Sequence, residues 1–497
     1  MATKKDIKKR EMKLDKSLGF FRFKEMKDGG YLITNELGRF VFLANDQFAE
    51  FINGKIDHDS DIFRELSENY FMAEGLDSKQ HVAEYTEKNQ FLFQKGPSLH
   101  IIVVTLRCNH NCVYCQANSC GLEEKNKDLD MESARKVVDF IFESPNESLT
   151  IEFQGGEPLL NWPVVKFIVG YARKKAKQKS KKIRIALVSN FSLLDKEKAD
   201  YLFKNKVTFC TSLDGPEKLH NKNRIWAGGN SHQAAAKWLE YLLANYKNYY
   251  VFQPGALTTI TKFSLPFWKE IVDEYVKFGF DNIILRPLTQ LGVAQKGWQK
   301  IGYTPDEFLE FYRKSLDYIF FLNLEKGEKF RELTATYFAV KIFLGADPNF
   351  FDLRSPCGAG IGQMLYNYNG DIYTCDEGRM MGDDMCKIGK LGDSYKDLLT
   401  HPATKSLCLA SCLESLPCDN CAYKPYCGTC PLLNYAESGN IFPQLPNSSR
   451  CRIYQGILDY LFSKIKENDK IKALLRDWAV GGMLILNEHK EKCILCK

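Results

Sequence analysis

Between residues 98 and 330 the chain alternates short β-branched apolar runs with stretches whose apolar residues recur at helical spacing. The helical pattern is clearest in MESARKVVDFIFES and PVVKFIVGYARKKA, where hydrophobic residues return every three or four positions. Alternation of this kind predicts parallel βαβ units. The candidate strands are HIIVVTL, LTIEFQ, IRIALVS, VTFCTSL, VFQPGALTTI and NIILRP.

Six β/α units are fewer than the eight of a closed barrel, so the pattern predicts an α/β fold with a partial (β/α)6 TIM-like barrel, open on one side. Ligands gather at the carboxyl ends of the strands in such folds, so the residues that follow each strand become the candidate site. We assign residues 98–345 to this barrel, 1–97 to an N-terminal module, 346–460 to a cysteine-rich domain and 461–497 to a C-terminal helical tail.

The N-terminal module follows a different pattern. GFFRFKEM and GGYLITNELGRFVFL predict a β-ribbon, and NDQFAEFING and HDSDIFRELSENYF predict small helices after it. A ribbon with small helices is the outline of a small winged-helix-like module. A simple folded extension remains the alternative.

Composition limits the class of protein. The 497 residues are 44% hydrophobic, enough for real cores, and the net charge of +6 is modest, so we expect no nucleic-acid partner. The charged N-terminus lacks the apolar core of a signal peptide, and no apolar run is long enough to span a membrane, so we expect a cytoplasmic protein without a membrane partner. Seventeen cysteines in a reducing compartment favour metal ligation over disulfides.

Cys108, Cys112 and Cys115 stand in LRCNHNCVYC, directly after the first barrel strand, with the spacing C-x3-C-x2-C. Three thiolates can hold three irons of a cubane cluster and leave the fourth iron open to a ligand, whereas a closed electron-transfer cluster uses four. A zinc site or plain buried thiols are the alternatives for three close cysteines alone.

Polar residues also follow the next strands. Two glycines, Gly155 and Gly156, allow close approach of the backbone to a ligand, and Glu157 can accept from an ammonium group. Taken singly, such features are most often turns and caps. Their position on successive strand ends favours a binding site. The other candidates are Ser189 and Asn190, which suit ribose hydroxyls, and Ser212 and Arg224, which suit a carboxylate.

With Tyr114 before the third cysteine, CNHNCVYC resembles the cluster motif of the radical S-adenosylmethionine (SAM) enzymes, and Gly155-Gly156-Glu157-Pro158 resembles their GGEP motif. The resemblance covers residues 98 to 290. It implies that Cys108, Cys112 and Cys115 hold a [4Fe-4S] cluster whose open iron chelates SAM. It further implies that one electron splits SAM to a 5'-deoxyadenosyl radical. Glu157 would bind the amino group of SAM, and Ser212 and Arg224 its carboxylate.

A second set of cysteines resembles the SPASM extension of radical SAM peptide maturases. Cys357 is followed by Gly370 after twelve residues and by Cys375 after four more, and a CxxC-x5-CxxC group and Cys451 follow. The resemblance implies two auxiliary [4Fe-4S] clusters, the first held by Cys357, Cys375 and Cys430, the second by Cys418, Cys421, Cys427 and Cys451.

The chain departs from that extension in two ways. The last interval of the central group is one residue short, and no cysteine follows Cys357 closely as a fourth ligand. The first auxiliary cluster therefore keeps an open iron or recruits Cys386, Cys408 or Cys412. Zinc remains an alternative for Cys418 to Cys430. The role of Cys493 and Cys496, which close the chain, stays open among a redox pair, a metal site and a tail.

Asp376 directly follows Cys375, where sulfatase maturases carry their proposed general base, so Asp376 is our candidate catalytic residue; ordering the cluster loop is its alternative role. SPCGAGIGQMLYNYNGDIYTCDEGRM most resembles the His-Xaa-Ser system radical SAM maturases. That resemblance implies a peptide or small protein substrate, and our hypothesis is that the protein abstracts a hydrogen atom from one of its residues. The N-terminal module resembles the peptide-recognition elements of such maturases, which implies that it binds a leader segment of the substrate. We also expect an electron donor such as flavodoxin or ferredoxin. The alternatives are a sulfatase maturase that forms formylglycine and a non-catalytic Fe-S or zinc peptide-binding scaffold.

Overall fold

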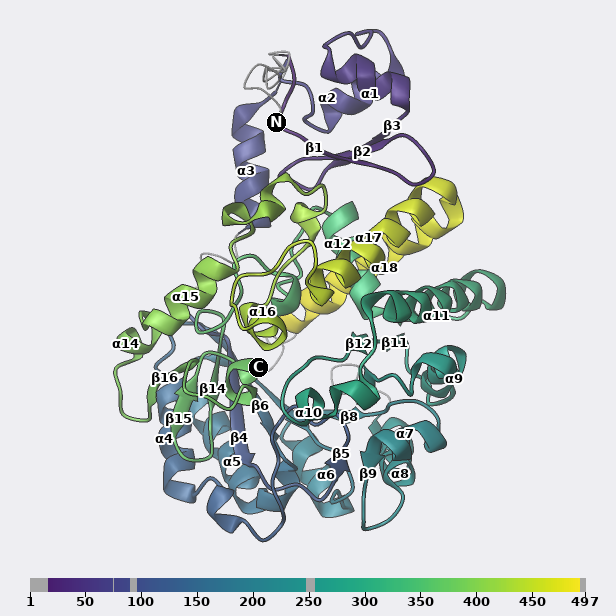
Figure 1. The fold of residues 1–497 in the computed structure, drawn as a ribbon. Helices are drawn as coiled ribbons and strands as arrows, with labels where there is room; N and C mark the ends of the chain where they lie inside the picture. Colours follow the sequence, from purple (N-terminus) through teal and green to yellow (C-terminus); the bar gives the residue numbers. More distant parts are fainter. Residues whose placement is uncertain (1–16, 75, 90–95, 247–254, 492–497) are drawn as a thin grey trace, which may run out of the picture.

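The computed structural model describes residues 17–74, 76–89, 96–246 and 255–491. Figure 1 shows three parts, with the N-terminal module at the top, the barrel at the bottom, and the C-terminal helices between them. Cys493 and Cys496 lie outside the described residues, so the question of their role stays as the sequence leaves it.

The barrel consists of parallel strands whose order in the sheet follows their order in the chain. Each strand pairs in parallel with the next along the sequence, which is the arrangement that successive βαβ units produce. The predicted partial (β/α)6 barrel is therefore confirmed. Its strands are β4 (Leu99–Thr105), β6 (Ser148–Gly155), β7 (Lys182–Val188), β8 (Val207–Ser212), β10 (Gly255–Ile260) and β12 (Leu285–Pro287).

The last predicted strand, NIILRP, is divided in the structure. Its first part, β11 (Asn282–Ile283), pairs with β13 (Arg331–Glu332) in a separate sheet, and only its second part, β12, pairs with β10. The buried Glu332 carboxylate accepts from the Leu285 amide at 3.1 Å. A side chain thus satisfies a backbone donor where the strand changes partners.

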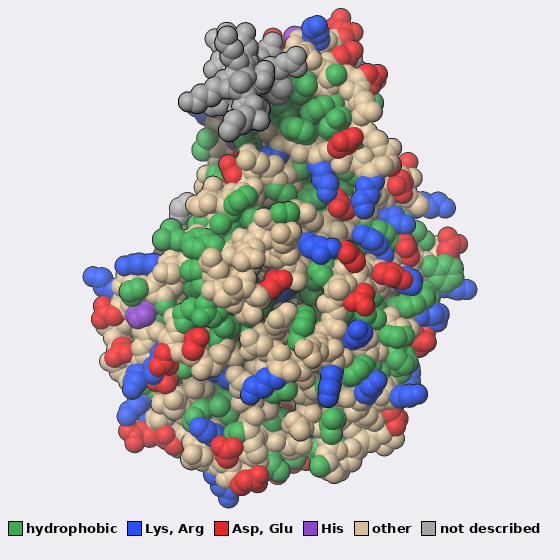
Figure 2. Space-filling model, viewed as in Figure 1, with side chains coloured by type: hydrophobic (Ala, Val, Ile, Leu, Met, Phe, Trp, Pro, Cys, Tyr) green, Lys and Arg blue, Asp and Glu red, His purple; other side chains and the backbone are tan. Residues whose placement is uncertain are grey.

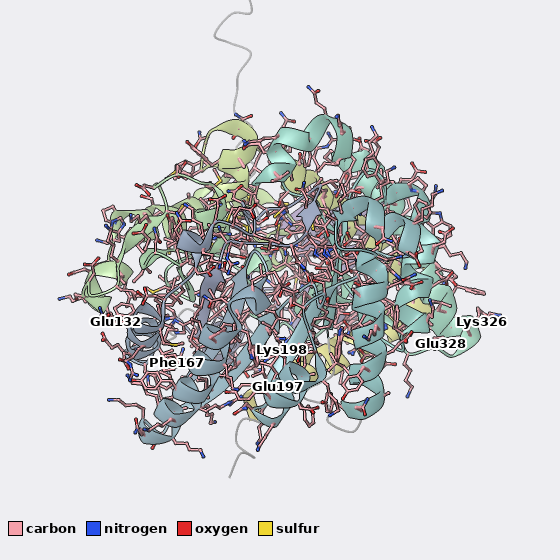
Figure 3. All side chains as sticks on the ribbon, turned by 90° about the horizontal axis from the view of Figure 1, so that it is seen from below. Glu132, Phe167, Glu197, Lys198, Lys326 and Glu328 are labelled. Carbon is pink, nitrogen blue, oxygen red and sulfur yellow. The ribbon has the colours of Figure 1, made fainter. Side chains whose placement is uncertain are left out.

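Helices cover the outer face of the barrel sheet. In α4 (Met131–Ile141) the Asp130 side chain caps the amino end by accepting from the Ser133 amide, and Val137, Val138 and Ile141 are buried against the sheet. In Figure 3 Glu132 of α4 and Lys326, which ends α11 (Pro305–Lys326), lie on opposite sides of the molecule. The other outer helices include α5 (Trp162–Gln178), α6 (Lys196–Lys204), α8 (Ser231–Tyr246) and α9 (Trp268–Lys277).

The cysteine-rich domain continues the barrel sheet. Its strand β14 (Gln363–Tyr366) pairs in parallel with β4, the first barrel strand, and β15 (Asp371–Tyr373) and β16 (Lys387–Lys390) extend the sheet in antiparallel fashion. The first barrel strand thus has partners on both sides, and the open side of the barrel lies against residues more than 200 positions later in the chain.

The C-terminal helices pack into the body of the protein. Helix α17 (Ser449–Glu467) crosses the predicted boundary at residue 460, and α18 (Asp469–Glu491) lies along α12 (Leu333–Phe343). Leu475, Trp478 and Ala479 of α18 are buried in the main hydrophobic core. Residues 461–482 are therefore part of that core.

The N-terminal module begins with an antiparallel sheet of β1 (Arg22–Glu25), β2 (Tyr31–Thr34) and β3 (Phe40–Leu43). Helices α1 (Asn45–Ile52), α2 (Asp61–Glu68) and α3 (Ser78–Lys88) follow. Its likeness to a winged helix stays a prediction. The sheet is held to the loop at residues 419–426 by Arg22 Nε to Asp419 O at 2.5 Å, Thr34 Oγ1 to Ala422 O at 2.8 Å, and Tyr426 Oη to Gly38 O at 3.0 Å.

The surface carries charges of both signs. Figure 2 shows Lys and Arg interspersed with Asp and Glu over the visible face, and hydrophobic side chains reaching the surface of the N-terminal module. In that module Phe20 and Phe23 are 53% and 52% exposed. Within the described residues, no helix has the length and apolar character to cross a membrane.

Candidate active site

A cavity of about 810 Å³ opens at the carboxyl ends of the barrel strands, and we call it the barrel cavity. The structure brings most of the predicted site residues together on its walls, although they come from four different β/α units and from the cysteine-rich domain. Of the residues predicted to bind the first cluster or SAM, Glu157 is the one that does not line it. The predicted residues on its walls are Cys108, Cys112, Tyr114, Cys115, Gly155, Gly156, Ser189, Asn190, Ser212, Arg224 and Asp376.

The loop with the three cysteines is held by a short ribbon. Strand β5 (Asn111–Cys112) pairs with β9 (Arg224–Ile225), which places Cys112 directly opposite Arg224. Burial raises the pKa of Cys108 to about 12 and that of Cys112 to about 11, and the Arg224 charge opposes the second shift. Both thiols are therefore protonated in the protein alone, and a bound cluster would take the place of their protons.

Tyr114 is buried between two charged groups. Its hydroxyl donates to the Asp214 carboxylate at 2.8 and 2.9 Å and accepts from Arg224 Nη1 at 2.6 Å. Burial raises the pKa of Tyr114 well above its ordinary value, so the hydroxyl keeps its proton. This chain of hydrogen bonds fixes the Arg224 guanidinium beside Cys112, where a planar cation suits a carboxylate ligand.

The two glycines pack against the cysteine loop itself. A Cβ on Gly155, whose φ is 149°, would lie 2.1 Å from the Thr105 carbonyl oxygen, and one on Gly156 would lie 2.1 Å from that of Arg107. The Gly156 amide donates to Thr105 O at 2.9 Å. We predicted that these glycines let the backbone approach a ligand. In the structure they let strand β6 approach the loop that carries Cys108.

Glu157 lies behind the cavity wall. Its fully buried carboxylate accepts from Ser189 Oγ and the Asn190 amide at 2.8 Å each, and from the Leu159 amide at 3.0 Å. Burial raises the pKa of Glu157, and these hydrogen bonds oppose the shift. The carboxylate therefore positions Ser189 and Asn190, which do line the cavity. Its predicted contact with SAM stays a prediction.

Sequence reasoning missed a second polar network at the cysteine loop. His110, between the first two cysteines, stacks on Trp226 with ring centroids 5.3 Å apart. Its Nε2 lies 2.9 Å from Ser231 Oγ, and its Nδ1 lies 2.9 Å from Asn190 Nδ2. The imidazole thus joins the cysteine loop to a predicted SAM contact. The histidine stands in the motif, but nothing in its spacing names these partners.

Cys210 on β8 lines the barrel cavity. Burial raises the pKa of its thiol to about 12, so it is protonated. The period of two along the strand accounts for its position, because Cys210 lies on the same face as Ser212 two residues later.

A second cavity of about 390 Å³ lies between the barrel and the cysteine-rich domain, and we call it the junction cavity. It brings together Cys357, Cys375 and Cys430, all predicted ligands of the first auxiliary cluster. Cys375 is the residue that caps the short helix α13 (Asp376–Met380), and its sulfur accepts from the Gly378 amide at 3.3 Å. Cys386, Cys408 and Cys412 are not among the residues that line this cavity.

The remaining predicted ligands, Cys418, Cys421, Cys427 and Cys451, also lie together. The charges of the other three each raise the pKa of Cys427, after the larger effect of burial. Through the part of the chain that is described, no three His, Cys, Asp or Glu side chains are close enough to hold a single metal ion.

Helix α13 joins the two cavities. Asp376 lines both, together with Glu152, Gln154 and Arg286 of the barrel. Arg379 of the same helix donates to the Ala117 carbonyl at 2.9 Å, next to the loop that carries Cys115. A substrate held in the junction cavity would therefore reach the barrel cavity past Asp376. Arg286 lines both cavities, and its Nη2 lies 4.0 Å from Glu377 Oε1.

Comparison with known families agrees with this geometry. Residues 102–260 match the Radical SAM superfamily. The chain thus contains a radical SAM domain, with the cofactors that this domain implies, SAM and a [4Fe-4S] cluster. The convergent cysteines of the C-terminal part fit auxiliary clusters.

Two curated relatives are similar to this chain. It is 22% identical over 382 residues to the cysteine-type anaerobic sulfatase-maturating enzyme of Clostridium novyi, covering 74% of this chain and 95% of that enzyme. It is 28% identical over 240 residues to the radical SAM cyclopropyl synthase TigE of Paramaledivibacter caminithermalis, covering 45% of this chain. This second match spans about half of the synthase, 49% of its length.

Two solved structures share the fold. Native anSMEcpe with bound AdoMet superposes with a TM-score of 0.63 at 19% identity, over 74% of this chain and 98% of that one. Streptococcus suis SuiB bound to precursor peptide SuiA superposes with a TM-score of 0.53 at 16% identity, over 86% of this chain and 98% of that one. At these identities the likeness establishes the fold alone.

Proposed function

We propose that this protein is a radical SAM peptide maturase that cleaves SAM reductively and abstracts a hydrogen atom from a residue of a ribosomally made peptide. The observation that carries the proposal is the convergence of Cys108, Cys112 and Cys115 with Ser212 and Arg224 on one cavity. The relatives that act on peptides support the substrate class. A cluster on the three cysteines would supply the electron that splits SAM into methionine and the 5'-deoxyadenosyl radical.

The residues of the chain divide the work of binding SAM. Arg224, held by Tyr114 and Asp214, offers a fixed guanidinium to the SAM carboxylate. Ser189 and Asn190, held by Glu157, offer short polar groups to the ribose. Each contact is fixed in advance by a buried partner, so binding orders few side chains.

Asp376 is the proposed general base. It lies on the wall shared by the two cavities, where it can take a proton from a substrate that reaches the barrel cavity. Leader binding by the N-terminal module belongs to the same proposal, as does an electron donor such as flavodoxin or ferredoxin. Membership of the His-Xaa-Ser subfamily and a cytoplasmic location stay predictions.

A sulfatase maturase that converts Cys or Ser to formylglycine is the second candidate. The coverage of 95% of the Clostridium novyi enzyme and the position of Asp376 after Cys375 favour it. Turnover of a sulfatase-derived peptide would separate it from the first candidate. The scaffold alternative gives no role to the ordered pair of Tyr114 and Arg224, and SAM cleavage would exclude it.

The deciding experiment is anaerobic reconstitution with iron and sulfide, then reduction with SAM and assay for 5'-deoxyadenosine. We expect about twelve irons per chain and deoxyadenosine formation. Cys115→Ala should bind about eight irons and cleave no SAM. Cys120→Ala is the matched control, since Cys120 lies on the same loop but does not line the cavity. This variant should keep about twelve irons per chain and should still cleave SAM. Cleavage by Cys115→Ala would reject the site.

A further inference from the structure

The two sides of the proposed SAM site come from different β/α units. Arg224, Tyr114 and Asp214 form the side that would take the SAM carboxylate, and Asn190 belongs to the side that would take the ribose. A ligand that spans both sides binds more tightly when they are held in place before it arrives. The inference that follows rests on the proposed function, because it takes the roles of these residues from it.

Ser231 connects the two sides from behind the cavity wall. It is the first residue of helix α8, is 2% exposed, and is not among the residues that line the barrel cavity. Asn230 caps this end of the helix by accepting from the Gln233 amide at 3.0 Å. The Ser231 hydroxyl lies 2.9 Å from His110 Nε2 and 3.1 Å from His220 Nε2. One buried hydroxyl thus contacts two imidazoles.

His220, on α7 (Glu217–Asn223), connects Ser231 to the carboxylate side. Its Nδ1 accepts from the Asp214 amide at 3.3 Å. A backbone amide can only donate, so His220 Nδ1 carries no proton and Nε2 donates to Ser231 Oγ. The Asp214 carboxylate in turn accepts from the Tyr114 hydroxyl. A continuous chain of hydrogen bonds therefore leads from Ser231 to the carboxylate side.

His110 connects Ser231 to the ribose side in the same way. The Ser192 amide donates to Asn190 Oδ1 at 3.0 Å, which leaves Asn190 Nδ2 facing His110. This Nδ2 donates to His110 Nδ1 and to Asn109 Oδ1, at 2.9 Å each. A proton on His110 Nδ1 could donate to Asn109 Oδ1, 3.1 Å away, but it would face the protons of Asn190 Nδ2. The His110 proton therefore lies on Nε2 and is donated to Ser231.

We propose that Ser231 is a positioning residue that couples the two sides of the SAM site, because its hydroxyl oxygen accepts from His110 and His220 at once. A serine oxygen has two lone pairs, enough for both donors. A shift of either imidazole changes the geometry at the shared oxygen, so SAM contacts on one side favour those on the other. Without the hydroxyl, two buried N–H groups lose their acceptor and each side moves separately.

The test is a double-mutant cycle on SAM affinity, measured by anaerobic titration calorimetry of the reconstituted full chain. Asn190→Ala removes the proposed ribose contact, and Tyr114→Phe loosens the carboxylate side. With Ser231 in place, the combined loss of affinity should differ from the product of the single losses by about threefold or more. In the Ser231→Ala background the losses should multiply to within about twofold. Ser231→Ala alone should weaken SAM binding by about tenfold.

Ser315→Ala is the matched control, since Ser315 is a fully buried serine whose hydroxyl donates to a backbone carbonyl of α11 at 3.0 Å. It should lose stability and keep the coupling. His220→Asn keeps an acceptor near the Nδ1 position but has no atom to reach Ser231, so it should also remove the coupling. In the metal-free chain, denaturant titrations should give non-additive losses for His110→Asn and His220→Asn, which give up the same acceptor.

Coupling that persists in either Ser231→Ala or His220→Asn would overturn the proposal. Loss of coupling in Ser315→Ala, or additive effects in the chain that keeps Ser231, would overturn it as well. SAM binding and deoxyadenosine formation by the unaltered chain are measured first. Their absence would reject the proposed function, whereas the coupling can fail in a chain that binds and cleaves SAM, so the two failures are distinguishable.

Discussion

The barrel cavity and the junction cavity differ in the sequence separation of the residues that line them. The three cysteines of the motif in the barrel cavity lie within eight residues of each other, and their partners follow on successive strands. The junction cavity joins Ile101 of β4 to Cys375 and Cys430, which both lie more than 270 residues later in the chain. A site at the ends of consecutive strands is encoded by local motifs, whereas a site between domains depends on long-range packing.

The two cavities also differ in their polar groups. Around the barrel cavity the charged and polar groups satisfy each other, as in the chain from Arg224 through Tyr114 to Asp214. The cysteines of the junction cavity sit in an apolar cluster with Ile101 and Leu365. Hydrogen bonds hold the side chains of the first site in place before any ligand binds. In the second site the carboxylates lie on a wall that they share with Arg286 and Arg450.

The largest effect should come from a substitution that disrupts the barrel cavity. In Gly156→Ala the added Cβ would lie 2.1 Å from the Arg107 carbonyl oxygen, so the cysteine loop must move. We expect loss of the radical SAM cluster and of SAM cleavage, while auxiliary iron stays. Iron analysis with deoxyadenosine assay checks this. Gly170→Ala, on a helix where only the Tyr201 hydroxyl comes within 4 Å, should keep full activity.

The corresponding test at the junction cavity changes a glycine of the cysteine-rich domain. Gly428, between two predicted cluster ligands, packs on the backbone of Leu353 and Arg354, where an added Cβ would lie 2.6 Å from the nearest atom. Gly428→Ala should lower auxiliary iron and leave SAM cleavage without substrate intact. If Gly428→Ala lost SAM cleavage as completely as auxiliary iron, the two cavities would not respond separately to substitution.

A smaller effect should follow from removing one hydroxyl of the barrel network. Tyr114→Phe leaves buried Asp214 and Arg224 without their shared partner, which should cost about 1–3 kcal/mol of unfolding free energy. SAM should bind about 10–100-fold more weakly, by titration calorimetry. Tyr275→Phe, an equally buried tyrosine that donates to Leu213 O, should lose stability alone. If Tyr114→Phe bound SAM with unchanged affinity, the proposed role of Arg224 in SAM binding would be wrong.

The last prediction concerns protein stability alone, at the contact between the barrel and the strand that the C-terminal part adds. Burial lowers the pKa of His100 on β4 to about 3, and its Nδ1 lies 3.0 Å from Tyr366 Oη on β14. The unfolded chain binds this proton near pH 6.5, so unfolding free energy falls as the pH drops from 6.5 towards 3, by about 1.4 kcal/mol per unit. Above pH 6.5 the contribution is constant.

Denaturant titrations of the metal-free protein between pH 6.5 and 4 measure this slope. His100→Gln should reduce the slope of unfolding free energy against pH by the equivalent of about one bound proton. His58→Gln, whose side chain is 65% exposed, serves as the matched control and should keep the original slope. An unchanged slope in His100→Gln would exclude His100 as the titrating group.

Much of the barrel was predictable because each strand and helix has its own hydrophobic period. The division of NIILRP was not, since Glu332, which takes the Leu285 amide, lies 47 residues further on. Nor could the pattern place β14 beside β4, because a short apolar strand carries no information about its partner. Pairing is decided by what else must be buried along the same edge.

The candidate site divides in the same way. Cys108, Ser212 and Arg224 were found from motifs at strand ends, and the structure brings them to one cavity. His110 and Asp214 were missed although they stand inside the same motifs, because their roles depend on hydrogen bonds to residues far along the chain.

By itself the sequence determined the parallel barrel, the three-cysteine loop and the class of chemistry, because hydrophobic period and motif spacing are local properties of the chain. Only the tertiary structure decided that Glu157 lies behind the cavity wall, that Cys210 faces it, and that Asp376 stands between two cavities. These positions depend on the packing of distant segments against each other. Close packing selects one arrangement from many that the same local pattern allows.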